Sequence, residues 1–244
     1  MIVWIDGSAG ASGDMLLGAL VGVGVPLDVL AAPIESLGLD LNLVERPVQR
    51  GGLAATKVDV VTSAGEPVGA EHHHRGLSDV VAILAQLSEP MRSTAVAVFE
   101  RLAHAEAEVH GIEVEQVHFH EVGALDAIAD IVGVTAGFAY LRSERGVTAV
   151  VASTLSLGSG QTRGAHGPIP IPAPAVLELL RGIAPVAAGP APFESTTPTG
   201  AALLAELVDR WGPMPSMTVG SVGVGAGGRD SDAVVNAVRL TLGR

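Results

Sequence analysis

The chain has 244 residues, 48% of them hydrophobic, so it can bury a substantial core as one large domain or two small ones. Its net charge of −12, with only 14 Lys and Arg residues, argues against a nucleic-acid partner, because neutralising phosphates takes clustered basic side chains. The chain has no cysteine, so any metal must be held by His and carboxylate side chains.

The sequence shows no feature of a secreted or membrane protein. The N-terminus lacks a basic region followed by an apolar run, so we expect no secretory signal. Nor does the chain contain a stretch of about 18 uninterrupted apolar residues, which a membrane-spanning helix would need. We therefore expect a soluble, cytoplasmic protein without a membrane partner.

The first half of the chain alternates strands and helices. An apolar strand at Ile2 to Asp6 leads into a glycine-rich loop, and a helix follows from Met15 to Val21. The pattern then predicts a helix at Leu27 to Leu37, a hairpin of strands Leu41 to Val48 and Ala55 to Thr62 around Gly51-Gly52, and helices at Ser78 to Leu87 and Pro90 to His110.

The second half continues the alternation. We expect a long helix to Leu141, a strand at Val147 to Ala152, a Gly/Pro-rich loop from Leu157 to Pro172, helices at Ala173 to Leu180 and Thr199 to Trp211, and strands at Met217 to Val222 and Ala233 to Leu240. The order predicts an α/β fold, a layered mixed sheet with flanking helices and a glycine-rich loop after the first strand. Residues 1–244 form one region, with a possible division into subdomains at about 1–65 and 77–244.

The strongest chemical signal is a cluster of His and acidic residues in the middle of the chain. If the segment ending at His120 is a strand, its period of two points His118 and His120 to one side, with Glu121 next to them. Asp126 and Asp130 are four residues apart and share one face of the following helix, where like charges repel. This pattern favours a metal site; a basic partner, solvation, or buried and capping roles are the alternatives.

The glycine-rich loop after the first strand is a candidate phosphate-binding loop. Backbone N–H groups at Gly10, Ser12 and Gly13 precede a helix, where an anion can bind. Asp6 and Asp14 flank the loop, which suits a phosphate bridged by a metal. The alternative is a tight turn in which Asp14 caps the helix.

Four further histidines are candidate ligands. His72, His73 and His74 are adjacent, and because neighbouring residues in an extended loop point in different directions, at most two of them would hold one ion. His166 precedes alternating prolines, which would hold its imidazole in a defined place. A solvated loop and a rigid connector are the respective alternatives.

Two segments near the C-terminal end offer further anion contacts. Thr197, Thr199 and Gly200 open a helix with hydroxyl and N–H groups, although most such sequences are only caps. Arg229 follows a glycine-rich segment and could reach a phosphate or carboxylate, although a hairpin turn explains that segment equally well.

Together these segments resemble the family of nickel-insertion proteins of lactate racemase maturation (LarC). The blocks that carry the resemblance are Ser12-Gly13-Asp14-Met15, His72-His73-His74-Arg75, His118 to Ala124 with Asp126 and Asp130, Ala165-His166-Gly167, Thr197-Pro198-Thr199-Gly200, and Gly225-Ala226-Gly227 with Arg229-Asp230. They run in family order across nearly the whole chain, and the central His block is the most specific of them.

The resemblance implies a protein that binds Ni²⁺ and inserts it into pyridinium-3,5-bisthiocarboxylic acid mononucleotide. The product is a nickel-pincer nucleotide with sulfur–carbon–sulfur coordination, and the family reaction depends on CTP with Mg²⁺ or Mn²⁺. On this hypothesis His118, His120 and Glu121 are core ligands, Asp126 and Asp130 are additional ones, and His72 to His74 and His166 form an entry set. Asp14 and Glu121 are the catalytic candidates; Asp6, Gly10, Ser12, Gly13, Thr197, Thr199, Gly200 and Arg229 are the candidates for nucleotide contact.

The chain departs from the family in two respects. Many members have Cys where this chain has Gly7, and full-length members continue well beyond the strand near Leu240 with a part thought to bind CTP. A truncated form, a separately encoded half and the first product of a split gene are the three explanations for this shorter length. The complete reaction is expected to need the family's C-terminal part, which a separate CTP-binding partner could supply, and the sequence leaves open whether the chain forms a homo-oligomer. A nickel storage or delivery module without catalysis and a metal-dependent phosphohydrolase are the two rival functions.

Overall fold

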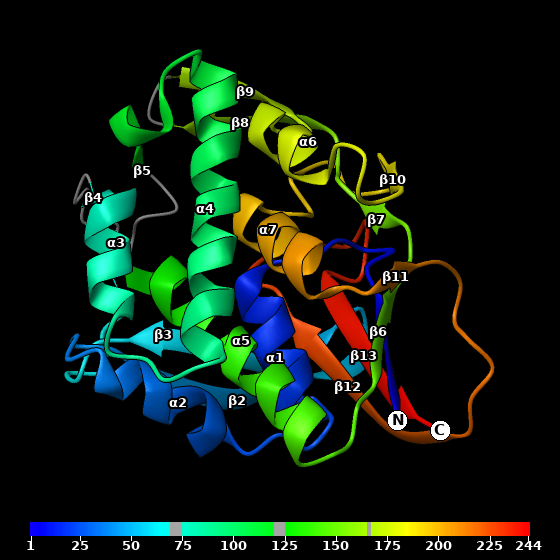
Figure 1. The fold of residues 1–244 in the computed structure, drawn as a ribbon. Coiled ribbons are helices and arrows are strands. Elements are labelled where there is room, and N and C mark those ends of the chain that lie inside the picture. Colours follow the sequence, from blue (N-terminus) through cyan, green and yellow to red (C-terminus); the bar gives the residue numbers. More distant parts are fainter. Residues whose placement is uncertain (69–74, 120–124, 165–166) are drawn as a thin grey trace.

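The computed structural model describes residues 1–68, 75–119, 125–164 and 167–244 (Figure 1). Within these residues, seven strands form one mixed sheet in the order β11-β6-β1-β13-β12-β3-β2. The strands are β1 (Ile2–Asp6), β2 (Asn42–Arg50), β3 (Leu53–Val61), β6 (Ala149–Ala152), β11 (Arg210–Trp211), β12 (Val219–Ala226) and β13 (Ala237–Gly243). The predicted layered α/β fold is confirmed.

The sheet combines strands from the whole length of the chain. β11, β6 and β1 run parallel, β13 is antiparallel to both β1 and β12, and β12 runs parallel to β3. The predicted hairpin of β2 and β3 is confirmed, and its turn at Gly51 and Gly52 has positive φ at both residues, which favours glycine. Strands from residues 1–65 and from residues 77–244 thus share one sheet.

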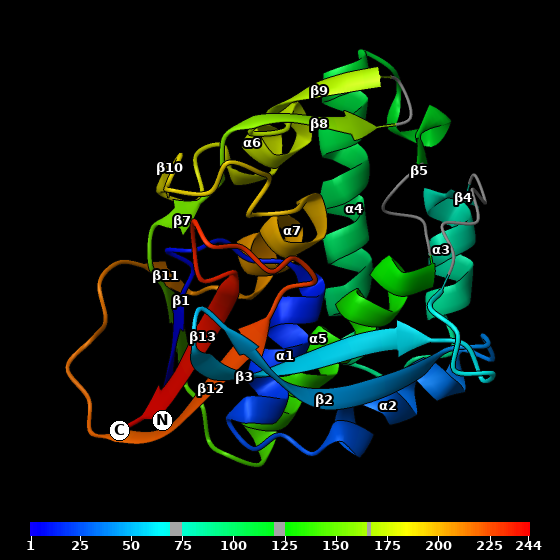
Figure 2. The ribbon, with the colours of Figure 1, turned by 180° about the vertical axis from the view of Figure 1, so that it is seen from behind.

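The helices lie on one side of this sheet, as two opposite views show (Figures 1 and 2). They are α1 (Gly13–Gly22), α2 (Leu27–Ser36), α3 (Leu77–Leu84), α4 (Met91–His110), α5 (Leu125–Ser143), α6 (Pro174–Leu180) and α7 (Pro198–Leu207). α4 ends at Gly111 in the left-handed conformation, as the sequence predicts. None of the described helices is long and apolar enough to cross a membrane.

Glycines let α1 approach the sheet and α5 closely. A Cβ at Gly18 would collide with the backbone carbonyl of Thr56 on β3, and one at Gly225 on β12 would collide with the backbone of α1. On α5, Gly133 makes room for Leu17 of α1. α5 is apolar on nearly all sides and is buried along most of its length, as expected of a central helix. This close packing brings the N-terminus of α1 next to β3 and α5.

Several short strands lie outside the main sheet. β4 (Arg75–Gly76) pairs with β5 (His118–Phe119), β7 (Leu155–Ser156) pairs with β10 (Val186–Ala187), and β8 (Gly160–Gly164) pairs with β9 (Gly167–Ile171). A 3-10 helix, η1 (Val114–Gln116), precedes β5.

Two sequence predictions about local structure are wrong. The segment from Leu157 to Pro172, expected to be a loop, contains the two-stranded ribbon of β8 and β9. Its prolines are compatible with this pairing, because each strand of an isolated ribbon has one edge that needs no N–H donor. The helix expected to reach Trp211 ends at Leu207. Beyond it, Asp209 exchanges backbone and side-chain hydrogen bonds with Val150, and β11 then pairs with β6, so sheet pairing overrides helix propensity.

Candidate functional site

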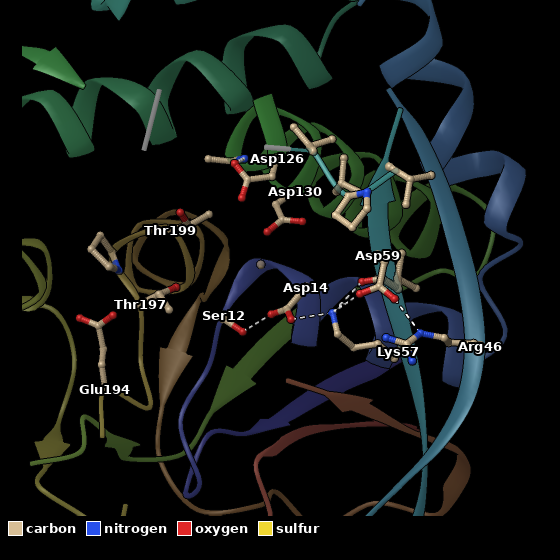
Figure 3. Close-up of a pocket in the computed structure, with 18 residues that line it drawn as sticks. Ser12, Asp14, Arg46, Lys57, Asp59, Asp126, Asp130, Glu194, Thr197 and Thr199 are labelled. Atoms are coloured by element: carbon tan, nitrogen blue, oxygen red, sulfur yellow. Dashed lines mark hydrogen bonds and ion pairs between the residues drawn. The ribbon is translucent and has the colours of Figure 1, made fainter. Parts of the chain in front are cut away.

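A cavity of about 550 Å³ lies where helices α1, α5 and α7 begin and strand β3 passes beside them (Figure 3). Its wall combines apolar residues of β3 with a dense set of polar and charged side chains. The polar and charged lining residues are Ser12, Asp14, Arg46, Lys57, Asp59, Asp126, Asp130, Glu194, Thr197 and Thr199. Five carboxylates and two basic groups line the cavity, so the described lining carries an excess of acidic groups.

Asp14 is fixed by hydrogen bonds on both of its carboxylate oxygens. It lies in the first turn of α1, where Oδ1 accepts from Ser12 Oγ and from the backbone N–H of Met15 at 2.8 Å. Oδ2 accepts from Lys57 Nζ, also at 2.8 Å. The carboxylate is therefore held in one orientation at the cavity wall.

Lys57 is the buried cation that pairs with Asp14. Its residue exposure is only 5%, and Nζ contacts Asp14 Oδ2 at 2.8 Å, Asp59 Oδ1 at 3.0 Å and the carbonyl of Val58 at 3.1 Å. Burial alone would lower the pKa of Lys57, but Asp14 and Asp59 outweigh it and hold this pKa above its usual value. Lys57 is therefore a permanent charge in the wall.

The chain of ion pairs continues to the neighbouring strand β2. Arg46 Nε donates to Asp59 Oδ2 at 2.7 Å, and burial of Asp59 is outweighed by Arg46 and Lys57, so the pKa of Asp59 is lowered. Figure 3 shows the resulting series Arg46–Asp59–Lys57–Asp14, which we call the ion-pair relay. It runs from an exposed guanidinium to the start of α1.

Asp126 and Asp130 lie one turn apart at the start of α5 and point into the cavity (Figure 3). Burial raises the pKa of Asp126, and the charge of Asp14 adds to this effect. Burial raises the pKa of Asp130 well above its usual value, and Asp14 and Asp126 raise it further, although Lys57 and the backbone N–H of Asp14 act in the opposite direction. The repulsion expected from the sequence is therefore present, and a bound cation would relieve it.

The other predicted metal ligands are placed as follows. His118 is an exposed residue of the short strand β5 and is not among the cavity-lining residues. His72, His73, His74, His120, Glu121 and His166 lie outside the described residues. Among the residues that the structure does describe, no three His, Asp or Glu side chains are grouped so that they could hold one metal ion.

The glycine-rich loop contributes only its last residues to the cavity. Ser12 and Gly13 line it, and Gly13 leaves no room for a Cβ because Asp130 lies against it. Asp6 is buried outside the lining, where its carboxylate accepts from the Ser8 backbone N–H at 3.1 Å and from Arg239 Nε at 3.0 Å. Gly10 has a φ of 103° and lies against the backbone of Ser195.

The start of α7 forms another part of the cavity wall. Thr197 is the N-cap, because its Oγ1 accepts from the Gly200 N–H at 3.2 Å, and Thr199 lines the cavity beside it. Gly200 lies against the backbone of Ala11, so it joins α7 to the glycine-rich loop. Arg229 is not in the lining; its guanidinium lies over the Phe193 ring, 5.3 Å from the centroid.

Sequence reasoning missed the ion-pair relay apart from Asp14. The available signal was Lys57 and Asp59, two charged residues two positions apart in an otherwise apolar strand, which places them on one face. Asp14, the partner of Lys57, is 43 residues earlier in the chain, and no local pattern connects the two segments.

The fold and the cavity define an α/β protein with an acidic cavity at the meeting point of three helix N-termini. The chain belongs to the nickel insertion protein family, which matches residues 3–244. A protein of Nocardioides sp. strain JS614, named pyridinium-3,5-bisthiocarboxylic acid mononucleotide nickel insertion protein, is 52% identical over 98% of this chain and 59% of its own length.

A second relative supports the same assignment. The protein of that name from Geobacillus kaustophilus strain HTA426 is 41% identical over 99% of this chain and 59% of its own length. The chain thus spans about three fifths of the length of these curated relatives, and no solved structure matches it. The family resemblance inferred from the sequence motifs is confirmed.

Proposed function

We propose that this chain takes up nickel and passes it into pyridinium-3,5-bisthiocarboxylic acid mononucleotide, the molecule named in the relatives' titles. The observation that carries the proposal is the match of residues 3–244 to the nickel insertion protein family. The cavity adds an acidic lining that includes Asp14, Asp126 and Asp130, although the described residues alone do not group three such side chains around one metal position. Burial and neighbouring carboxylates raise the pKa of Asp126 and Asp130, and a cation nearby would favour their charged forms. The same cavity is of a size that small-molecule ligands occupy.

Imidazole and carboxylate ligands suit a metal that must later be given away. They hold Ni²⁺ while leaving it exchangeable toward the softer sulfur atoms of the mononucleotide. We propose His118, His120 and Glu121 as core ligands, with Asp126 and Asp130 adding to them. His72 to His74 and His166 would form the entry set.

Asp14 is our candidate for the group that accepts a proton during insertion. Sulfur–carbon–sulfur coordination requires a new nickel–carbon bond, so the ring carbon must lose its proton as that bond forms. A base for this step must be fixed in place. Asp14 is fixed by its hydrogen bonds with Lys57 and Ser12, and Glu121 is the second candidate.

We propose that the CTP-dependent part of the reaction, with Mg²⁺ or Mn²⁺, needs sequence beyond these 244 residues, either in the same chain or in a separate C-terminal partner. The relatives are longer than this chain, and the chain covers 59% of each of the two described above. The complete reaction would take place in the cytoplasm.

The first test is a nickel titration by calorimetry, with the bound metal quantified, on the untagged chain and on the variant Asp126→Asn/Asp130→Asn. We expect nickel binding to weaken by at least tenfold in the variant. Asp28→Asn is a matched control, because Asp28 is an exposed aspartate in the first turn of α2, away from the cavity. Unchanged binding in a folded double variant would rule out this role for the two carboxylates.

A second variant tests the proposed imidazole ligands. His118→Ala/His120→Ala should also lose tight nickel binding while keeping the circular dichroism spectrum of the parent chain. Binding that persists at full strength would move the site to His72 to His74 or elsewhere.

A nickel storage or delivery module without catalysis is the second candidate function. An insertion assay with a separately produced C-terminal partner distinguishes the two. If free nickel replaces the chain without loss of product, the chain only stores or delivers metal.

A further inference from the structure

The charges in the cavity are arranged with a cationic end and an acidic end. Lys57 and Arg46 lie on the β2–β3 side, whereas Asp126 and Asp130 lie on the α5 side (Figure 3). Asp14 lies between the two ends and is bound to Lys57. A ligand that fits this arrangement carries an anionic group at one end and a cationic or metal-binding group at the other.

Of the two basic groups in the described lining, Lys57 has no hydrogen left to offer a ligand. An ammonium group has three donors, and those of Lys57 have three acceptors: Asp14, Asp59 and the Val58 carbonyl. Lys57 therefore positions Asp14 and Asp59 but does not bind a substrate directly.

Arg46 differs because its guanidinium is only partly engaged. Nε donates to Asp59 Oδ2 at 2.7 Å, and within the part of the chain that the structure describes no other hydrogen bond of this guanidinium is found. The ion pair with Asp59 fixes the plane of the group, while its terminal nitrogens stay available at the cavity wall. Arginine in such a setting can bind phosphate through two parallel N–H donors.

The start of α7 is a poorer place for a phosphate. Pro198 has no N–H, the Gly200 N–H is used by Thr197 Oγ1, and the Thr197 N–H is used by the Ala11 carbonyl. Three backbone positions at this helix start therefore offer no N–H group to an anion.

We propose that Arg46 binds the phosphate of the mononucleotide and thereby orients its pyridinium ring toward Asp126 and Asp130. This inference rests on the proposed function and adds the orientation of the substrate and a residue that sets its specificity. The thiocarboxylate groups must lie at the metal, so the phosphate is the anion left for the cationic end.

The test compares two probes that differ only in the phosphate: nicotinic acid mononucleotide and its dephosphorylated riboside. Arg46→Gln should weaken binding of the mononucleotide by about tenfold, the effect of one charge-assisted hydrogen bond, and leave binding of the riboside unchanged. Arg46→Lys should recover part of the loss. Arg92→Gln is the matched control, because Arg92 is an exposed arginine whose Nε also pairs with a carboxylate, Glu89, outside the cavity.

Four results would overturn the proposal. The first is equal weakening of both probes by Arg46→Gln, which would show a structural role. The second is a preference for the phosphorylated probe that Arg46→Gln leaves unchanged, and the third is the absence of this preference in the parent chain. The fourth is loss of this preference in Thr199→Val, which would place the phosphate at α7. A nickel titration of Arg46→Gln without nucleotide distinguishes failure of this inference from failure of the proposed nickel-binding function. The nickel affinity of this variant should remain within about twofold of the parent.

Discussion

Aspartates with opposite electrostatic surroundings lie close together at the cavity. Asp14 is bound by a lysine, a hydroxyl and a backbone N–H, whereas Asp130 has its pKa raised by burial and by two neighbouring carboxylates. Such divergence between neighbouring carboxyl groups is typical of functional sites, although structural ion pairs also cause it. A carboxyl group at position 130 therefore costs the protein folding stability at neutral pH.

This cost predicts that Asp130→Asn stabilises the protein. Because the folded pKa of Asp130 is raised, stability is lost as pH rises from the unfolded pKa through the folded one. At pH 7 the amide removes this penalty and can still accept the Asp14 N–H, so Tm should rise by about 2–4 °C for each kcal/mol regained. The measurement is thermal unfolding from pH 4 to pH 8.

The pH dependence separates this effect from a change in packing. The stabilisation by Asp130→Asn should shrink as pH falls toward the unfolded pKa of about 4, because only below that pKa is the aspartate protonated in both states. Asp28→Asn, at an exposed first-turn position, should show no such trend. A variant less stable than the parent at pH 7 would contradict the argument.

At the cavity, single residues were more predictable than their contacts. The sequence marks the starts of three helices with small and polar residues, and these starts carry Asp14, Asp126 and Thr197. Because the three helices begin at the same cavity, the three side chains line it together. Lys57 reaches Asp14 only because glycines bring α1 close to β3, and no short-range pattern carries that information.

The packing of α1 against the sheet depends on glycine at the scale of the element. Gly225 on β12 has no room for a methyl group, because the Met15 carbonyl and the Ala19 N–H of α1 lie against its Cα. This close approach of α1 to the sheet places Asp14 within reach of Lys57 on β3.

Gly225→Ala should therefore lower the free energy of unfolding by about 1–3 kcal/mol or more, as overpacked cores do. It should also weaken nickel binding, because α1 would move away from Lys57. Urea denaturation measures the first effect and calorimetry the second.

Gly212→Ala provides the comparison, because nothing lies within 4 Å of the position of its Cβ and its φ is not in the left-handed region. We expect that substitution to change stability by less than about 1 kcal/mol. Equal effects of the two substitutions would show that the close approach of α1 is not what Gly225 provides.

Elements with a local signal were predicted well, and those decided by tertiary pairing were not. The β2–β3 hairpin and the end of α4 each have a glycine with positive φ that the sequence displays. The ribbon of β8 and β9 has prolines at Pro168 and Pro170, which locally indicate a loop. Only the pairing of the two segments makes them strands.

The whole molecule is joined across its sheet by an ion pair between distant segments. Asp6 at the end of β1 is buried and is bound by Arg239 of β13, and the two residues are directly paired in register. Burial would raise the pKa of Asp6, but hydrogen bonds from Ser8 and Arg239 outweigh it, so the pKa is lowered. Its charged form therefore stabilises the sheet.

Asp6→Asn should lower the free energy of unfolding at pH 7 by about 1 kcal/mol, a modest value because Arg239 is half-exposed. With a lowered folded pKa, the contribution is complete above the unfolded pKa and is lost as pH falls through the folded one. Urea denaturation at several pH values should thus show the difference from the parent shrinking below about pH 4.

Arg239→Gln should reproduce this loss at neutral pH, and the double variant should lose less than the sum of the two single variants. Additive losses would mean that the pair contributes no coupling energy across the sheet. Nickel binding should stay unchanged in all three variants, because neither side chain lines the cavity.

The position of β1 between β6 and β13 has a consequence for how the chain folds. Ile2 pairs with Ala149 on one side and with Gly243 on the other, so the first strand to be synthesised waits for partners from the far end of the sequence. Contacts of such high sequence separation slow folding, because a long loop must close before they form. Until then the edge of β1 that pairs with β13 and the edge of β3 that pairs with β12 are open to pairing with other chains, which predicts a dependence on chaperones during synthesis.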